Sequence, residues 1–174
     1  MSNYEIGAIT GVVKFLWHRL EGAGWQKING LTPIIESQQE PEILESGMPF
    51  IVYNWSYVNQ GTFFELSKEQ AVFVVYGDQS QVRKTVNMIV DLFKRMDWAA
   101  EDVNNFIHKD LSMPEPYLTQ IKNFDYKSFS IISATGPDPA VAEDGRHEGV
   151  VMIQYSYTHP IDGAGLREEP NLAS

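Results

Sequence analysis

The chain has 174 residues, with 13 basic and 23 acidic side chains, a formal charge of −10 and no cysteine. This length is most simply one domain, which can bury about 70% of the surface of its unfolded state. The absence of cysteine excludes disulfides, thiolate nucleophiles and cysteine-ligated zinc. The acidic excess argues against binding DNA or RNA by neutralising phosphates, which needs clustered lysine and arginine. Such a chain could still surround a polyanion without gripping it, although simple solubility is the favoured interpretation.

No segment has the pattern of a signal peptide or a membrane span. Glu5 comes early, the apolar residues near the N-terminus are periodic, and no apolar run approaches roughly 20 residues. We therefore expect no membrane partner, and we treat the glycosylation sequon at 54–56 as coincidental.

The first predicted element is a helix of roughly five turns. Ser2 and Glu5 have the spacing of a capping box, and Gly22 and Gly24 are expected to end the helix. The apolar positions between these ends recur at helical spacing and form one stripe: Ile6, Ile9, Val13, Leu16, Trp17 and Leu20.

Residues 25–47 are predicted to form a long arm or loop, with an extended piece within 25–35. The second half is polar, and Pro41 and Gly47 break regular structure. Loops of this length in compact domains are often functional or disordered.

Two strands are expected next. The run from Pro49 alternates, so that one face carries Ile51, Tyr53 and Trp55 and the other carries Phe50, Val52 and Asn54. Residues 62–66 continue as an extended aromatic segment, and 71–76 form a β-branched, apolar strand.

A long helix and a shorter one follow. Asp78 and Gln81 have the pattern of a second capping box, and Asp97 is expected to cap the shorter helix. The long helix carries an apolar stripe at Val82, Val86, Ile89, Val90, Phe93 and Met96, and the shorter one carries Ala100, Val103, Phe106 and Ile107.

The last predicted strands span 126–135 and 149–158, separated by a Pro- and Gly-rich loop at 136–148. Residues 1–160 are thus expected to form a single α+β domain, and 161–174 a flexible tail. In this domain an N-terminal helix and a long central helix pack on a mainly antiparallel sheet.

The candidate chemistry is sparse. No pair of histidines has the spacing of a helical zinc site. Asp144, His147 and Glu148 could bind a metal, but a solvated loop is strongly favoured. The glycine-rich pieces at 22–24 and 163–165 lack the strand and helix that a phosphate-binding loop needs, and no G-x-S-x-G elbow is present. We predict no catalytic residue, no cofactor and no metal.

An aromatic set leaves three interpretations open: Tyr53, Trp55, Tyr57, Phe63 and Phe64. Core packing is favoured first and an oligomer interface second, because tyrosine and tryptophan are enriched at interface centres. Stacking on bases or sugars is the third.

Two segments carry a resemblance to a known family: MPFIVYNWS at 48–56 and QAVFVVYGDQSQVRKTVNMIVDLFKRMDWAAEDVN at 70–104. They resemble the tail-terminator or neck proteins of tailed bacteriophages, especially contractile-tailed ones, and the order of elements extends the resemblance over roughly residues 1–160. The resemblance implies a virion protein of the tail neck, assembled in the host cytoplasm. It forms a closed ring, typically a hexamer, that ends polymerisation of the tail tube and sheath and docks on the head connector. DNA would pass through the lumen without specific binding, and no catalytic residue is implied.

Within this reading, aromatic residues have structural roles: Tyr53, Trp55, Tyr76 and Phe93. Arms at 26–47 and 136–148 could bridge neighbouring subunits. The candidate contacts to neighbours or to the lumen are Tyr53, Trp55, Glu40, Glu42, Asp138 and Asp144. An electronegative channel would let phosphates slide, which suits the charge of −10.

Two alternatives remain. One is a head-completion or adaptor ring of the same neck. The other is a small-molecule-binding α+β domain or enzyme, which would have an enclosed apolar pocket with convergent polar groups.

Overall fold

The computed structural model describes residues 6–37, 43, 46–59, 66–139 and 145–159. They form an α+β fold with a five-stranded, mostly antiparallel sheet in the order β1-β2-β3-β5-β4, which confirms the predicted fold class. The strands are β1 (Ile34–Glu36), β2 (Phe50–Asn59), β3 (Ser67–Gly77), β4 (Asp125–Pro139) and β5 (His147–Thr158). The helices are α1 (Ala8–Gly22), α3 (Gln79–Phe93), α4 (Asp97–Lys109) and α5 (Tyr117–Lys122).

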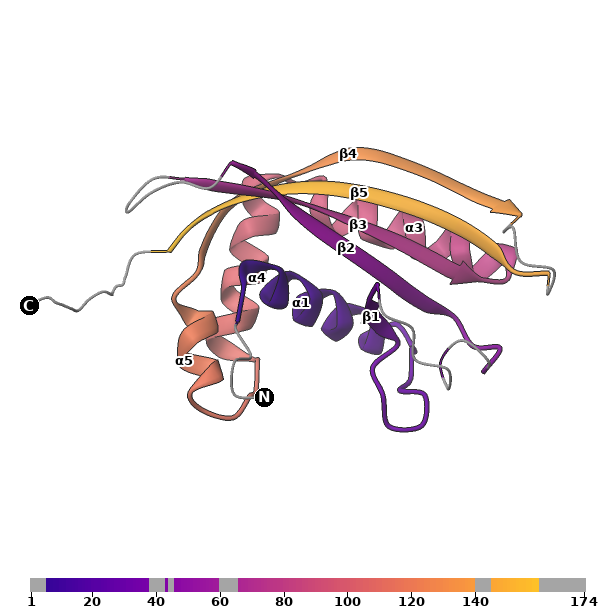
Figure 1. Ribbon diagram of the computed structural model, residues 1–174, viewed down its shortest axis with the longest axis horizontal. Coiled ribbons are helices and arrows are strands. Elements are labelled where there is room, and N and C mark those ends of the chain that lie inside the picture. The colour runs from indigo at the N-terminus through magenta and orange to yellow at the C-terminus, as the bar shows by residue number, and fades with distance from the viewer. Residues whose placement is uncertain (1–5, 38–42, 44–45, 60–65, 140–144, 160–174) are drawn as a thin grey trace, which may run out of the picture.

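Helices α1, α3, α4 and α5 lie on one side of the curved sheet. Helices α1, α4 and α5 lie below it in Figure 1. Helix α3 packs against the same face, with Val82 and Val86 beside Gly149 of β5. Because strand side chains alternate, every second residue of β3 and β5 enters the core between sheet and helices.

The predicted capping box of α3 is confirmed. The Gln81 amide N–H donates to Asp78 Oδ1 at 2.8 Å, and the Asp78 amide N–H donates to Gln81 Oε1 at 2.9 Å. The stripe is buried at Val82, Val86, Ile89 and Phe93. Met96 was expected to complete it, and that prediction is wrong: the helix ends at Phe93, and Met96 lies in a left-handed turn with φ of 58°.

The other helix ends differ in detail from the predictions. Helix α1 begins at Ala8 after Gly7, and the expected capping residues Ser2 and Glu5 lie outside the described residues. Met96 is the N-cap residue of α4, so Asp97 does not cap it but sits in its first turn, where a carboxylate complements the helix dipole. Helix α5, which begins directly after Pro116, has no counterpart among the predicted elements.

The segment at 26–47 was predicted to be an arm, and its described part instead packs on its own sheet. Strand β1 pairs in parallel with β2, from Ile34 opposite Ile51 to Glu36 opposite Tyr53. Ile28 and Ile43 pack on Phe50, on the side of the sheet opposite the main core. These apolar side chains keep the segment close to its own chain.

The predicted loop at 136–148 is also corrected. Strand β4 continues to Pro139 and β5 begins at His147, so that Asp138 pairs with Glu148 in the ladder. Strand β4 is an edge strand with three register shifts. Bulged edge strands tolerate glycine and proline, which explains how Gly136 and Pro137 fit.

Candidate functional site

The sheet face turned away from the helices is the first candidate site, and we call it the open face. Helices α1, α3, α4 and α5 lie on the other side of the sheet (Figure 1), and at one end Ile28 and Ile43 pack over Phe50 and Val52. The open face carries Val52, Asn54, Ser56, Gln70, Val72, Val74, Ser128, Ser130, Ser133, Thr135, Val150, Met152, Gln154 and Ser156. None of these side chains is charged, although 21% of the chain is.

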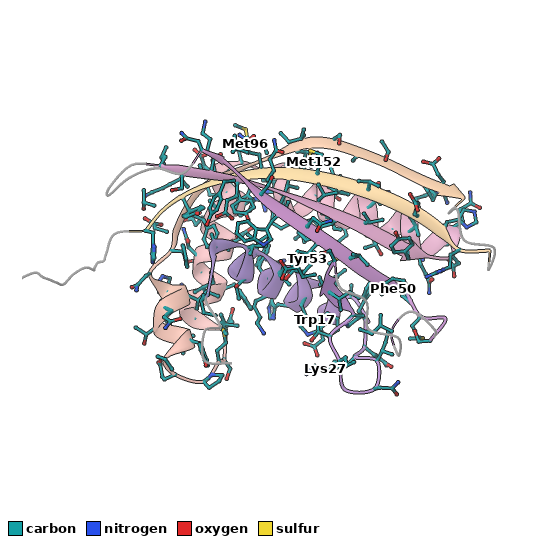
Figure 2. The ribbon with its side chains drawn as sticks, in the orientation of Figure 1. Trp17, Lys27, Phe50, Tyr53, Met96 and Met152 are labelled. Carbon is teal, nitrogen blue, oxygen red and sulfur yellow. The ribbon has the colours of Figure 1, made fainter. Side chains whose placement is uncertain are left out.

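An apolar centre with polar surroundings gives the open face its character. Val72 pairs with Met152, and Val74 pairs with Val150, in the middle of the sheet. One row further along, Gln70 Nε2 donates to Gln154 Oε1 across 3.4 Å. In Figure 2 the Met152 side chain points out from this face, whereas Tyr53 points towards α1.

Charges lie at the two ends of this face. Lys68 pairs with Ser156 at one end, and Glu148 pairs with Asp138 at the other. At this second end the Arg146 guanidinium stands over the stacked rings of Phe50 and Tyr76, 5.6 Å from each centroid.

The predicted interface residues Tyr53 and Trp55 lie on the helix side of β2. Both are partly buried against the main core, and the Tyr53 ring lies 6.2 Å from that of Phe73. The Trp55 indole N–H donates to Glu36 Oε2 at 3.1 Å. Core packing is therefore present for both, and contact with a neighbouring subunit stays a prediction.

The predicted acidic contacts are not brought together. Asp138 is exposed in β4, far along the sheet from the end of β2 that holds Trp55. Glu40, Glu42 and Asp144 lie outside the described residues, as do Phe63 and Phe64.

The metal hypothesis finds no support among the described residues. They contain no group of three or more histidine, aspartate or glutamate side chains that could hold a metal ion. His147 and Glu148 are consecutive in β5, so their side chains leave the strand on opposite faces.

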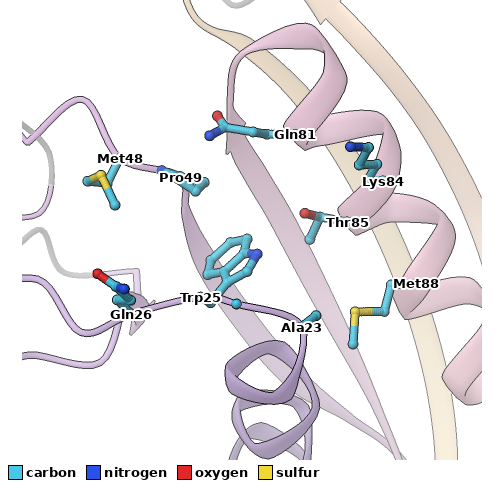
Figure 3. A pocket seen from close by; sticks show the side chains of 10 residues that line it. Ala23, Trp25, Gln26, Met48, Pro49, Gln81, Lys84, Thr85 and Met88 are labelled. Carbon is cyan, nitrogen blue, oxygen red and sulfur yellow. The ribbon is translucent and has the colours of Figure 1, made fainter.

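A cleft of about 440 Å³ lies between the end of α1, the start of β2 and residues 81–88 of α3. Figure 3 shows Gln81, Lys84, Thr85 and Met88 of α3 facing Trp25, with Met48 and Pro49 beside it. Lys84 is the only charged side chain of this lining. An apolar cleft with one cation suits an apolar group that carries or adjoins a carboxylate.

A buried polar cluster joins the first half of β3 to the last residues of β5 inside the core. Glu69 is 2% exposed, and its carboxylate accepts hydrogen bonds from the hydroxyls of Tyr155, at 2.7 Å, and Tyr157. Burial raises the pKa of Glu69, and the two tyrosine hydrogen bonds oppose that rise. Burial and the nearby Glu69 raise the pKa of Tyr155 as well.

Sequence reasoning missed this cluster, although a signal was present. Glu69 occupies an inward position of a strand whose other inward residues include Ala71, Phe73 and Val75. A carboxylate at such a position needs buried partners. Because solvent and substrates cannot reach Glu69, its role here is to hold strands together.

No protein-family model and no curated protein sequence matches this chain. None of the described helices is long and apolar enough to cross a membrane.

Proposed function

We propose that this chain is a structural protein of a phage tail that forms a ring at the head-proximal end and ends tail-tube polymerisation. The open face is the observation that carries the proposal. The sequence resemblance is the basis for the proposed place in the particle, and the composition of the open face supports a role in an assembly. The chain would perform no chemistry.

The composition of the open face is typical of a protein–protein interface. Interface centres are depleted in charged residues and surrounded by polar ones. Val72, Val74 and Met152 supply an apolar centre, and serine and glutamine side chains surround it. Exposed apolar strand faces rimmed by polar residues mark interaction sites in soluble proteins. The face therefore suits contact with an adjacent protein of the tail, such as the tail tube or the head connector.

The charge of −10 suits a ring around DNA. A negative lumen repels phosphates, so DNA can pass without being held. An assembly whose pore is lined with lysine and arginine would contradict this part of the proposal. A head-completion or adaptor ring of the same neck shares these properties, and the two are separated by position: a terminator purifies with tails that lack heads.

The cleft beside Trp25 favours a second candidate function, the binding of a small molecule. Its volume of about 440 Å³ falls within the range of ligand pockets, roughly 300–1,000 Å³. However, the carboxyl and hydroxyls with the most strongly perturbed environments, Glu69, Tyr126 and Tyr155, lie inside the core and not in this cleft. Thermal stabilisation of the protein by a panel of metabolites would support this alternative.

The proposal is tested by native mass spectrometry and negative-stain imaging of the purified protein, alone and with the tail-tube protein encoded by the same genome. We expect closed rings in at least the mixture, because ring formation can be templated. Monomers under both conditions would refute the proposal.

A further inference from the structure

The junction between α3 and α4 exposes two large apolar side chains. Met96 is 58% exposed and Trp98 is 65% exposed, the highest value among the large apolar residues that the structure describes. Asp97 lies between them. We call residues 96–98 the knob. Tryptophan and methionine are both enriched at protein interfaces, and tryptophan is frequent among the residues that dominate binding energy.

The backbone holds the knob in a defined shape. Met96 has φ of 58°, a conformation that residues other than glycine rarely adopt. Its carbonyl accepts hydrogen bonds from the amide of Ala100, at 3.2 Å, and of Phe129 in β4, at 3.4 Å. A strained turn fixed to a helix and a strand presents its side chains with little loss of freedom on binding.

The cleft beside Trp25 has the complementary character. Its walls include Trp25, Met48 and Met88, which suit an indole and a thioether. Lys84 supplies a positive charge opposite the negative charge of Asp97. Neither Lys84 nor Asp97 belongs to the ion pairs Lys94–Asp91, Arg95–Asp102 and Lys127–Asp125 of the described residues.

One chain cannot fill its own cleft. Lys84 lies in the first half of α3 and the knob follows its last residue, Phe93, about 14 Å further along the helix axis. Figure 2 shows Met96 and Lys27, which follows the cleft residue Gln26, on opposite sides of the molecule. Two different patches at opposite ends of a subunit generate a head-to-tail contact, which closes into a ring when the rotation between copies permits.

We infer that the occupant of the cleft is the knob of a second copy of this chain, with Trp98 against Trp25 and Met88 and with Asp97 beside Lys84. This inference rests on the proposed function and deepens it by naming the subunit contact of the ring. The open face is then left for a different protein of the tail.

Site-specific cross-linking tests this contact directly, because the chain has no cysteine of its own. Met88→Cys places a thiol in the cleft, and Met96→Cys places one on the knob. With a short bismaleimide, we expect the double variant to give a ladder of covalent oligomers. A mixture of the two single variants should give a covalent dimer, whereas each alone should stay largely uncross-linked. Pairing Met96→Cys with Leu31→Cys, which lies outside the cleft, provides the negative control.

The outcomes separate this inference from the proposed function. A ladder that stops at the mass of a closed ring supports both. A covalent dimer in the mixture without rings in the microscope supports the contact and contradicts ring closure. Rings by native mass with no cross-link between 88 and 96 leave the proposed function intact and overturn this inference. Cross-linking by Met96→Cys alone, as efficient as in the mixture, would also overturn it, because it indicates a symmetric knob-to-knob contact.

Charge reversal adds a readout that does not depend on thiols. Lys84→Glu should weaken association at least about tenfold, since close charge pairs at interfaces couple strongly, and Asp97→Lys in the same chain should restore it. Lys14→Glu, an exposed change on α1 outside the cleft, is the matched control and should leave association unchanged. If the double reversal associates no better than Lys84→Glu, Asp97 does not face Lys84.

Discussion

The Tyr155 hydroxyl donates a hydrogen bond to Glu69 Oε1 across 2.7 Å, and the two residues are also direct cross-strand partners in the ladder between β3 and β5. The contact lies inside the core, since both residues are almost fully buried. Tyr157 donates to the other carboxylate oxygen, so both oxygens of Glu69 have a donor. The cluster therefore joins the two central strands where an apolar pair would otherwise be expected.

Removing one donor should destabilise the fold. Tyr155→Phe leaves Glu69 Oε1 buried without its hydrogen bond, which costs about 1–3 kcal/mol of unfolding free energy. Chemical denaturation followed by circular dichroism measures this loss. Tyr57→Phe removes a hydroxyl from a side chain that is 54% exposed and should change the stability by less than about 0.5 kcal/mol. Equal effects of the two variants would show that the buried hydrogen bond contributes nothing.

Glu69 should also give the stability a pH dependence. Burial raises the folded-state pKa of Glu69 above its ordinary value of 4.5, so the folded state holds the proton to higher pH than the unfolded state does. The stabilising contribution of the bound proton is complete below pH 4.5 and is lost as the pH rises through the folded-state pKa. Glu69→Gln keeps the shape and removes the titration, so its stability relative to the wild type should increase over that range. Denaturation curves at several pH values test this, and parallel pH profiles for the two proteins would contradict it.

Helix α1 approaches β4 so closely at position 11 that only glycine fits there without a clash. A Cβ at Gly11 would overlap the Tyr126 hydroxyl oxygen and would lie 2.9 Å from Ile107 Cδ1. Tyr126 cannot move away freely, because it is buried and its hydroxyl donates to the Ala8 carbonyl. Gly11→Ala should therefore cost about 1–3 kcal/mol, despite the better helix propensity of alanine.

Gly22 provides the matched control on the same helix. A Cβ there meets no atom within 4 Å. Gly22→Ala should be neutral or stabilise the protein by at most about 1 kcal/mol. Melting temperatures that fall equally in both variants would show that the contact at Gly11 is not the cause.

The open face should fail as an interface when it carries a charge. Val72→Lys places an ammonium at its apolar centre, and we expect assembly with other tail proteins to fall at least about tenfold, because charges are disfavoured in interface centres. The monomer should stay folded, since Val72 is outside the main core. Val72→Thr has a similar shape and strand propensity and should assemble nearly as well. Sedimentation of mixtures with the tail-tube and connector proteins measures the assembly of both variants. Full assembly of Val72→Lys would show that the open face is not an interface.

Local patterns predicted a large part of this fold. The stripe from Val82 to Phe93 and the alternation from Val151 to Tyr157 each follow from one periodicity, and the structure contains both. The position of 26–37 could not be predicted in this way, because the parallel pairing of β1 with β2 depends on contacts distant in sequence. The length of β4 was also predicted wrongly. The strand continues past Gly136 and Pro137 because it lies at the edge of the sheet, and the sequence alone does not give the strand order.

The candidate sites were predicted less well than the fold. Tyr53 and Trp55 were identified as aromatic residues on one face of an alternating strand, but this pattern could not predict which side of the sheet the helices cover. The cleft and the knob were not predicted at all. Met96 was predicted to lie on the buried stripe of the long helix, but α3 ends at Phe93 and Met96 lies in the turn before α4. The periodicity of apolar residues predicts which face of a helix is buried, but it does not predict the residue at which the helix ends.

The most direct test of the account is the native mass of the protein mixed with its tail-tube protein. The account predicts a ring with a central hole and, for six copies of the 19.7 kDa chain, a subcomplex of about 118 kDa. A protein that stays at 19.7 kDa and never joins a tail would contradict it.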